Sequence, residues 1–194
     1  NVKCGQNGTT LFDNESISPL LPEDNAGPMC FLPRTRFKQM DGRHISAAEL
    51  KANGGDVVMG PGREEVRVLR TRRLEPAYQD IICVTTEDNQ YPFQATSLHR
   101  LDISTPEGKQ VAHAAKLLEL QDASICTGTA YRTVVGVSIV REHTEVVQVT
   151  FENDAKVLAW VLPKRPTRSK PRVFWEQAAV ACRGARLSLE DDLA

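Results

Sequence analysis

Short runs of alternating apolar and polar residues dominate residues 30–162. Each run is rich in β-branched or aromatic side chains and is bounded by Gly, Pro, Asn or Asp, a pattern that predicts strands. The predicted strands are Val57–Met59, Val66–Leu69, Ile81–Thr85, Tyr91–Ala95, Val134–Val140, Glu145–Phe151 and Val157–Leu162. The pattern therefore predicts an all-β domain.

Brief helical structure is predicted where the alternation stops, at Ser46. Ser46 and Glu49 have the spacing of a capping box, in which each side chain satisfies a backbone N–H of the other residue. Gly54 and Gly55 are suited to end this helix. The sequence Gly60-Pro61-Gly62 indicates a hairpin turn and not a phosphate-binding loop.

Three segments lie outside the β-rich region. Residues 1–29 are rich in Asn, Gly, Pro, Ser and Asp and are predicted to be a leader or the tail of a preceding segment. Residues 163–172 carry basic charge and three prolines, which predicts a linker. Within residues 173–194, apolar residues from Val173 to Leu187 recur at helical spacing and predict a C-terminal helix that ends near Gly184, followed by a tail. The helix either docks on the domain itself or binds a partner.

The β-rich region contains an internal repeat at an offset of about 65 residues. Asp80–Glu87 falls on Glu145–Glu152 when the chain is slid over itself. Upstream, Ile45, Ala48 and Asp56 fall on Val111, Ala114 and Asp122. The repeat predicts a pseudo-twofold fold that arose by duplication.

The composition narrows the class of protein only slightly. The chain has 194 residues, a formal net charge of -1, 41% hydrophobic and 25% charged residues. This composition is typical of a globular domain, and no nucleic-acid partner is expected. No stretch has the eighteen or so consecutive apolar residues of a membrane span. The chain begins at Asn1 and not at Met, which suggests a fragment or a processed product, and its compartment stays open.

The five cysteines stand singly, without a Cys-x-x-Cys pair, so neither a structural zinc site nor a cofactor is predicted. Cys83, Cys126 and Cys182 lie in apolar surroundings and are expected to be buried structural residues. Cys4 is either a disulfide partner or a tail residue. Cys30 is different, because Thr96 and His99 further along the chain supply it with an imidazole partner.

The chain resembles the hedgehog/intein superfamily, whose domain is called Hint. Cys30–Phe37, the Ala48–Leu50 helix and the Gly55–Val58 turn resemble its opening block. Phe93–His99 is similar to a second block with the core Thr-x-x-His, and Glu145–Phe151 to a late strand. The resemblance covers about residues 30–162 and implies a duplicated all-β horseshoe.

The resemblance implies autoprocessing, a single-turnover reaction of the chain on its own N-terminal segment. The Cys30 thiol attacks the carbonyl carbon of Met29 and converts the Met29-Cys30 amide into a thioester. His99 protonates the leaving amine, and Thr96 hydrogen-bonds the scissile peptide or holds the imidazole. The reaction requires the Cys30 and His99 side chains to approach that peptide and the thiol to be accessible.

Departures from the family pattern limit the outcome of such a reaction. The chain has no His-Asn pair of the kind that completes intein splicing, and Gln148 stands where many inteins have an Asp. Hedgehog sterol transfer uses an Asp on an earlier strand. The matching stretch, Leu69–Leu74, contains no acid, and Glu75 is expected just past the strand. The second nucleophile is therefore water, a thiol or another molecule. The alternative is a degenerate Hint module that has a binding or structural role and no catalytic activity.

Overall fold

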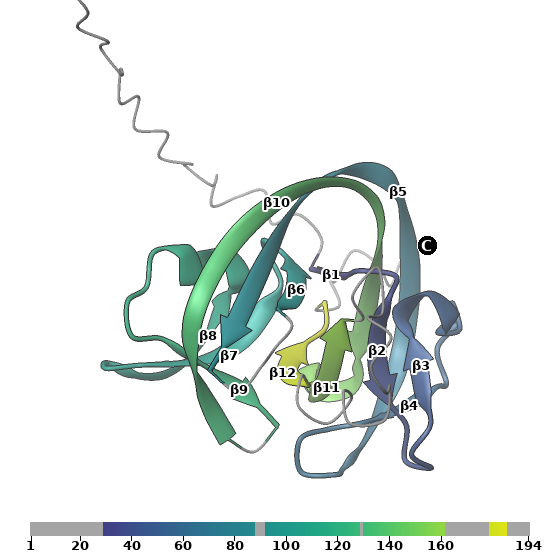
Figure 1. Cartoon of the computed structure of the whole chain (residues 1–194). Coiled ribbons are helices and arrows are strands. Elements are labelled where there is room, and N and C mark those ends of the chain that lie inside the picture. The colour runs from purple at the N-terminus through teal and green to yellow at the C-terminus, as the bar shows by residue number, and fades with distance from the viewer. Residues whose placement is uncertain (1–28, 88–91, 129, 162–178, 186–194) are drawn as a thin grey trace, which may run out of the picture.

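The structure, a computed structural model, describes residues 29–87, 92–128, 130–161 and 179–185. Two successive units of the chain have the same order of elements (Figure 1). The first unit contains β1 (Cys30–Phe31), β2 (Thr35–Lys38), β3 (His44–Ser46), the 3-10 helix η1 (Ala47–Glu49), β4 (Val57–Met59) and β5 (Glu65–Thr86). The second contains β6 (Phe93–Thr96), β7 (Arg100–Thr105), β8 (Gly108–His113), η2 (Ala114–Leu118), β9 (Ser124–Thr127) and β10 (Ala130–Phe151). The 3-10 helix η3 (Glu152–Asp154) and strands β11 (Lys156–Val161) and β12 (Val180–Arg183) follow.

The internal repeat is therefore a repeat of structure. The long strands β5 and β10 each contain 22 residues, and both of their ends are separated by the offset that the sequence predicted. The two units make equivalent pairings, because β11 extends β2 of the first unit while β12 extends β7 of the second. The predicted all-β, pseudo-twofold horseshoe is confirmed.

The strands β5 and β10 form a curved antiparallel ribbon that arches over the rest of the molecule (Figure 1). Register shifts interrupt the pairing at three places, and such bulges bend a ribbon and increase its twist. β1 pairs with β10, and β6 pairs with β5, so the ribbon carries one short strand from each unit.

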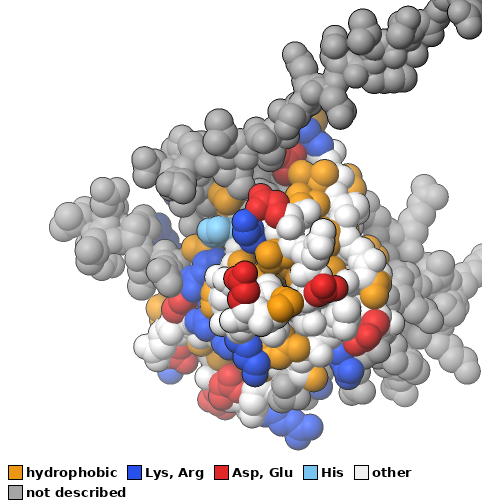
Figure 2. All heavy atoms as spheres, turned by 90° about the vertical axis from the view of Figure 1, so that its left-hand side faces the viewer, with side chains coloured by type: hydrophobic (Ala, Val, Ile, Leu, Met, Phe, Trp, Pro, Cys, Tyr) orange, Lys and Arg blue, Asp and Glu red, His pale blue; other side chains and the backbone are white. Residues whose placement is uncertain are grey.

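The hydrophobic core lies beneath both ends of the ribbon and contains Phe31, Phe37, Leu101 and Ile103, each at most 2% exposed. The rings of Phe31 and Phe37 meet edge to face with centroids 5.0 Å apart. On the face shown in Figure 2, hydrophobic side chains are dispersed among basic and acidic ones. Within the described residues, no helix has the length and apolar character needed to cross a membrane.

The capping box at Ser46 is confirmed as the start of η1. The Ser46 backbone N–H and hydroxyl donate to Glu49 Oε2 over 2.8 and 2.7 Å. The predicted hairpin turn is also confirmed, because it joins β4 to β5 and the Gly60 N–H donates to Glu64 O over 2.9 Å.

The predicted C-terminal helix is wrong for the part that the structure describes. Val180–Arg183 is strand β12, which pairs with β11 and with Leu101 of β7. Val180, Ala181 and Cys182 are all buried, and a short, fully apolar run does not distinguish a buried helix from a buried strand. Residues 1–28 of the predicted leader (1–29), the predicted linker (163–172) and the first part of the predicted helix (173–178) lie outside the described residues.

Two further strand boundaries differ from the expectation. The predicted strands Val66–Leu69 and Ile81–Thr85 are parts of the single strand β5, and their counterparts in the second unit are parts of β10. Glu75 therefore lies inside β5 and not beyond it. The middle of the ribbon is exposed on both faces, so its sequence lacks the alternation by which a half-buried strand is recognised.

Gly54 supplies the first test of this architecture. Its φ is +75°, in the left-handed region that favours glycine, and a Cβ there would lie 2.2 Å from Leu69 O of β5. Gly55 has φ +90°, and a Cβ there would meet nothing within 4 Å. We expect Gly54→Ala to destabilise the domain by at least about 3 kcal/mol, and Gly55→Ala by only about 1 to 2 kcal/mol from backbone strain. Urea unfolding measures the free energy of unfolding of both variants. Equal losses of stability would contradict the close approach of the loop after η1 to β5.

Candidate functional site

Three elements meet at the backbone of Cys30. β1 holds Cys30 against the ribbon, where its Cα is opposite that of Gln148 in β10. Thr96 is the last residue of β6, and His99 follows in the turn before β7. In that turn the His99 N–H donates to Thr96 O over 3.0 Å, which brings the first and fourth residues of Thr-x-x-His close together.

Thr96 and His99 both bind the carbonyl oxygen of Cys30. The Thr96 hydroxyl donates to it over 3.0 Å, and His99 Nδ1 lies 3.1 Å from it. Because a carbonyl oxygen only accepts hydrogen bonds, Nδ1 carries the proton in this contact. The structure thus brings together all three predicted site residues, with both donors on the Cys30-Phe31 peptide group. The expectation placed them at the preceding Met29-Cys30 peptide.

The imidazole of His99 is fully enclosed. His99 is 0% exposed, and the ring of Phe31 packs edge to face on it with centroids 4.4 Å apart. Burial lowers the pKa of His99 to about 4, although the contact with the Cys30 carbonyl opposes this shift. At neutral pH His99 is therefore an uncharged imidazole protonated on Nδ1. Its Nε2 is buried and has no hydrogen-bond partner among the described residues.

The Cys30 thiol is also buried, which differs from the expected accessible nucleophile. Cys30 is 0% exposed, and burial raises the pKa of its thiol to about 12. The protonated thiol and the neutral imidazole have the same cause, since each charged form would lose its hydration in this interior. The site as folded contains no charged nucleophile at neutral pH.

The chain that follows β12 reaches the same part of β10. The Ala185 N–H donates to Val149 O over 2.8 Å, one residue from the position opposite Cys30. A Cβ at Gly184 would lie 2.3 Å from Val149 O, so this approach requires glycine. No sequence pattern predicts this contact, and Gly184 was predicted to lie at the end of a helix. Gly184 is far from Cys30, Thr96 and His99 in the sequence, and no local pattern predicts the contact with Val149.

Of the other described cysteines and histidines, His113 reaches the turn that carries His99, where its Nδ1 lies 2.8 Å from Leu98 O. Cys83, Cys126 and Cys182 are buried, as predicted, and burial raises the pKa of Cys182 and Cys126. His113 and His143 are exposed, whereas His44 is half-buried in β3 beside Trp160. The described residues contain no cluster of three or more His, Cys, Asp or Glu suited to a metal ion.

Comparison with known proteins identifies the fold. No known family matches the sequence, and no curated protein is significantly similar to it. The structure is similar to a bacterial intein-like domain from Clostridium thermocellum, with a TM-score of 0.56 at 14% identity, covering 80% of this chain and 99% of that one. It is also similar to a DnaB intein from Synechocystis, with a TM-score of 0.53 at 15% identity, covering 81% and 99% of the two chains. The MchDnaB-1 intein has a TM-score of 0.53 at 14% identity, with 78% and 98% covered. The chain therefore has the Hint fold.

The burial of His99 predicts a dependence of stability on pH. Its pKa is about 4 in the folded protein, against the ordinary histidine value of 6.5, so the unfolded state binds more protons between these values. This contribution to stability is present above about pH 6.5 and is lost as the pH falls toward 4, by roughly 3 kcal/mol in total. We expect urea unfolding of His99→Gln to show a correspondingly weaker loss of stability in acid. His143→Gln, on the exposed ribbon, is the control, and an unchanged acid dependence in His99→Gln would contradict the prediction.

Proposed function

We propose that this domain cleaves its own chain by an N-to-S acyl shift at the Met29-Cys30 bond. The thiol of Cys30 attacks the Met29 carbonyl carbon, so that a C–S bond forms and the C–N bond breaks. The thiol proton ends on the amine of Cys30, which leaves the atoms and charges of the shift balanced. The resulting thioester is then cleaved by water or another nucleophile, and residues 1–29 are released.

The observation that carries this proposal is the double hydrogen bond to the Cys30 carbonyl. Thr96 and His99 lie 66 and 69 residues from Cys30 in sequence, yet both donate to one buried oxygen. These contacts hold the backbone of Cys30 beside an imidazole, and catalysis by proximity and orientation requires such positioning. The neutral imidazole has a protonated and an unprotonated nitrogen, so it has the chemistry to transfer a proton from sulfur to the leaving amine.

The burial of the thiol favours a second candidate, an inert Hint module with a binding or supporting role. A thiol with a pKa of about 12 is almost wholly protonated at neutral pH, and thiolate is the reactive form. The side chain opposite Cys30 is the uncharged Gln148, which supplies no base. The two candidates differ in one measurable property, the formation of a thioester at Met29.

Intact-mass spectrometry of the full chain, before and after incubation with hydroxylamine or a thiol, tests the proposal. We expect a fragment that begins at Cys30, together with residues 1–29 carrying the nucleophile on Met29. Cys30→Ala should yield neither product. Cys83→Ala is the matched control, because it removes another buried strand cysteine. An unchanged mass of the parent chain with every nucleophile would favour the inert module.

The rate of this cleavage should depend steeply on pH. Because the thiol pKa of about 12 lies far above neutrality, the thiolate fraction rises about tenfold for each pH unit. We expect the hydroxylamine rate, measured between about pH 7 and pH 9, to rise by nearly this factor until a later step limits it. His99→Gln should lower the rate over the whole range. A rate that does not change with pH would show that thiol ionisation does not limit the reaction.

A further inference from the structure

Cys30, Gln148 and Arg72 form a row across three adjacent strands. Cys30 of β1 is opposite Gln148 of β10, and Gln148 is opposite Arg72 of β5. Residues directly opposite in antiparallel strands project their side chains from the same face of the sheet. The strand spacing of about 4.8 Å separates the Cα atoms of Cys30 and Arg72 by roughly 10 Å.

Burial decreases along this row, from the thiol toward solvent. Cys30 is buried, Gln148 is half-buried, and Arg72 is exposed. Side chains two residues apart on a strand share a face, so Arg70 lies beside Arg72 on this side of the ribbon. The row therefore has a buried sulfur at one end and the exposed guanidinium of Arg72 at the other.

The charge along this part of the ribbon is predominantly positive. β5 carries Arg70, Arg72 and Arg73, with Glu75 as the nearest acid on the same strand. Across the ribbon, Glu145 lies 3.9 Å from Arg73 and compensates that charge in part. Among the described residues, no acidic side chain forms an ion pair with Arg72.

From this row we infer that the second nucleophile is a small thiol or amine that carries an anionic group, such as a carboxylate or sulfonate. This inference rests on the proposed function. The guanidinium of Arg72 binds the anionic group while the thiol or amine attacks the Met29 carbonyl carbon of the thioester. The C–S bond breaks, the new acyl bond forms, and the Cys30 sulfur leaves with the electron pair and takes up a proton. Arg72 acts as a positioning residue for the nucleophile and has no part in bond making.

The test compares thiols of different charge on the full chain, with 2-mercaptoethanesulfonate as the anionic probe and 2-mercaptoethanol as the neutral one. Arg72→Gln should lower the rate ratio of the anionic to the neutral thiol by roughly two- to tenfold, as expected for unit charges about 10 Å apart near a protein surface. High salt should lower the ratio in the wild-type protein. Comparing this ratio between the variant and the wild-type protein cancels the intrinsic difference in reactivity between the two thiols.

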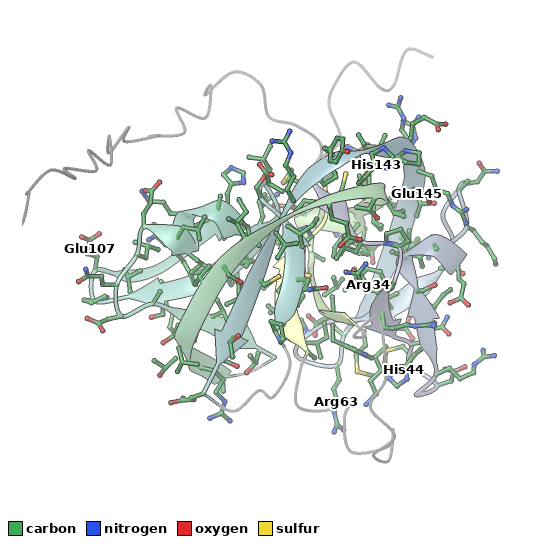
Figure 3. All side chains as sticks on the ribbon, turned by 45° about the horizontal axis from the view of Figure 1, so that its top comes forward. Arg34, His44, Arg63, Glu107, His143 and Glu145 are labelled. Atoms are coloured by element: carbon green, nitrogen blue, oxygen red, sulfur yellow. The ribbon has the colours of Figure 1, made fainter. Side chains whose placement is uncertain are left out.

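Arg63→Gln is the matched control, because it changes the net charge equally at another exposed arginine. Arg63 lies in the turn before β5 and far from Glu145 of the ribbon (Figure 3). This variant should keep the wild-type ratio. If both thiols cleave the chain and the ratio is unaffected by Arg72→Gln, the inference is overturned while the proposed function stands. If neither thiol cleaves the chain, the proposed function itself fails.

Discussion

The antiparallel pairing of β5 with β10 is the interaction on which the rest of the structure depends. Each strand belongs to a different unit of the duplicated chain, and their ladder joins the two units over nearly the full length of both strands. β1 attaches to β10 and β6 to β5, so the ribbon also sets where Cys30 and Thr96 lie. Without this pairing the two hydrogen bonds to the Cys30 carbonyl would have to overcome the entropy of closing a loop of more than sixty residues.

The same burial that orders the site also favours the uncharged forms of its thiol and its imidazole at neutral pH. Cys30 and His99 are both fully buried, and the Phe31 ring packs on the imidazole. This burial excludes the water that would solvate a thiolate or an imidazolium. Stability and reactivity are therefore opposed at one place in the fold. The exposed end of the row, at Arg72, retains the charge that the buried end lacks.

Sequence-based predictions were correct for features that depend on residues close together in the chain and wrong for features that depend on tertiary contacts. The capping box at Ser46 and the hairpin turn at Gly60 depend on residues close together in the chain, and both were predicted correctly. The middle of β5 was missed, because a ribbon exposed on both faces shows no alternation. Val180–Arg183 was assigned to a helix, since only its pairing with β11 and β7 makes it a strand.

The all-β class, the duplication and the three residues that meet at the site could be inferred from the order of residues alone. The pattern of apolar and polar residues, the residues of the turns and the internal repeat can all be recognised in the sequence. Cys30, Thr96 and His99 can be recognised by their chemical type. Three properties are visible only in the folded chain: which peptide group the two donors bind, how deeply the thiol is buried, and that Arg72 shares its row. These properties depend on strand register and on the enclosure of groups distant in sequence. Both arise when the two units pair, and neither has a local signal.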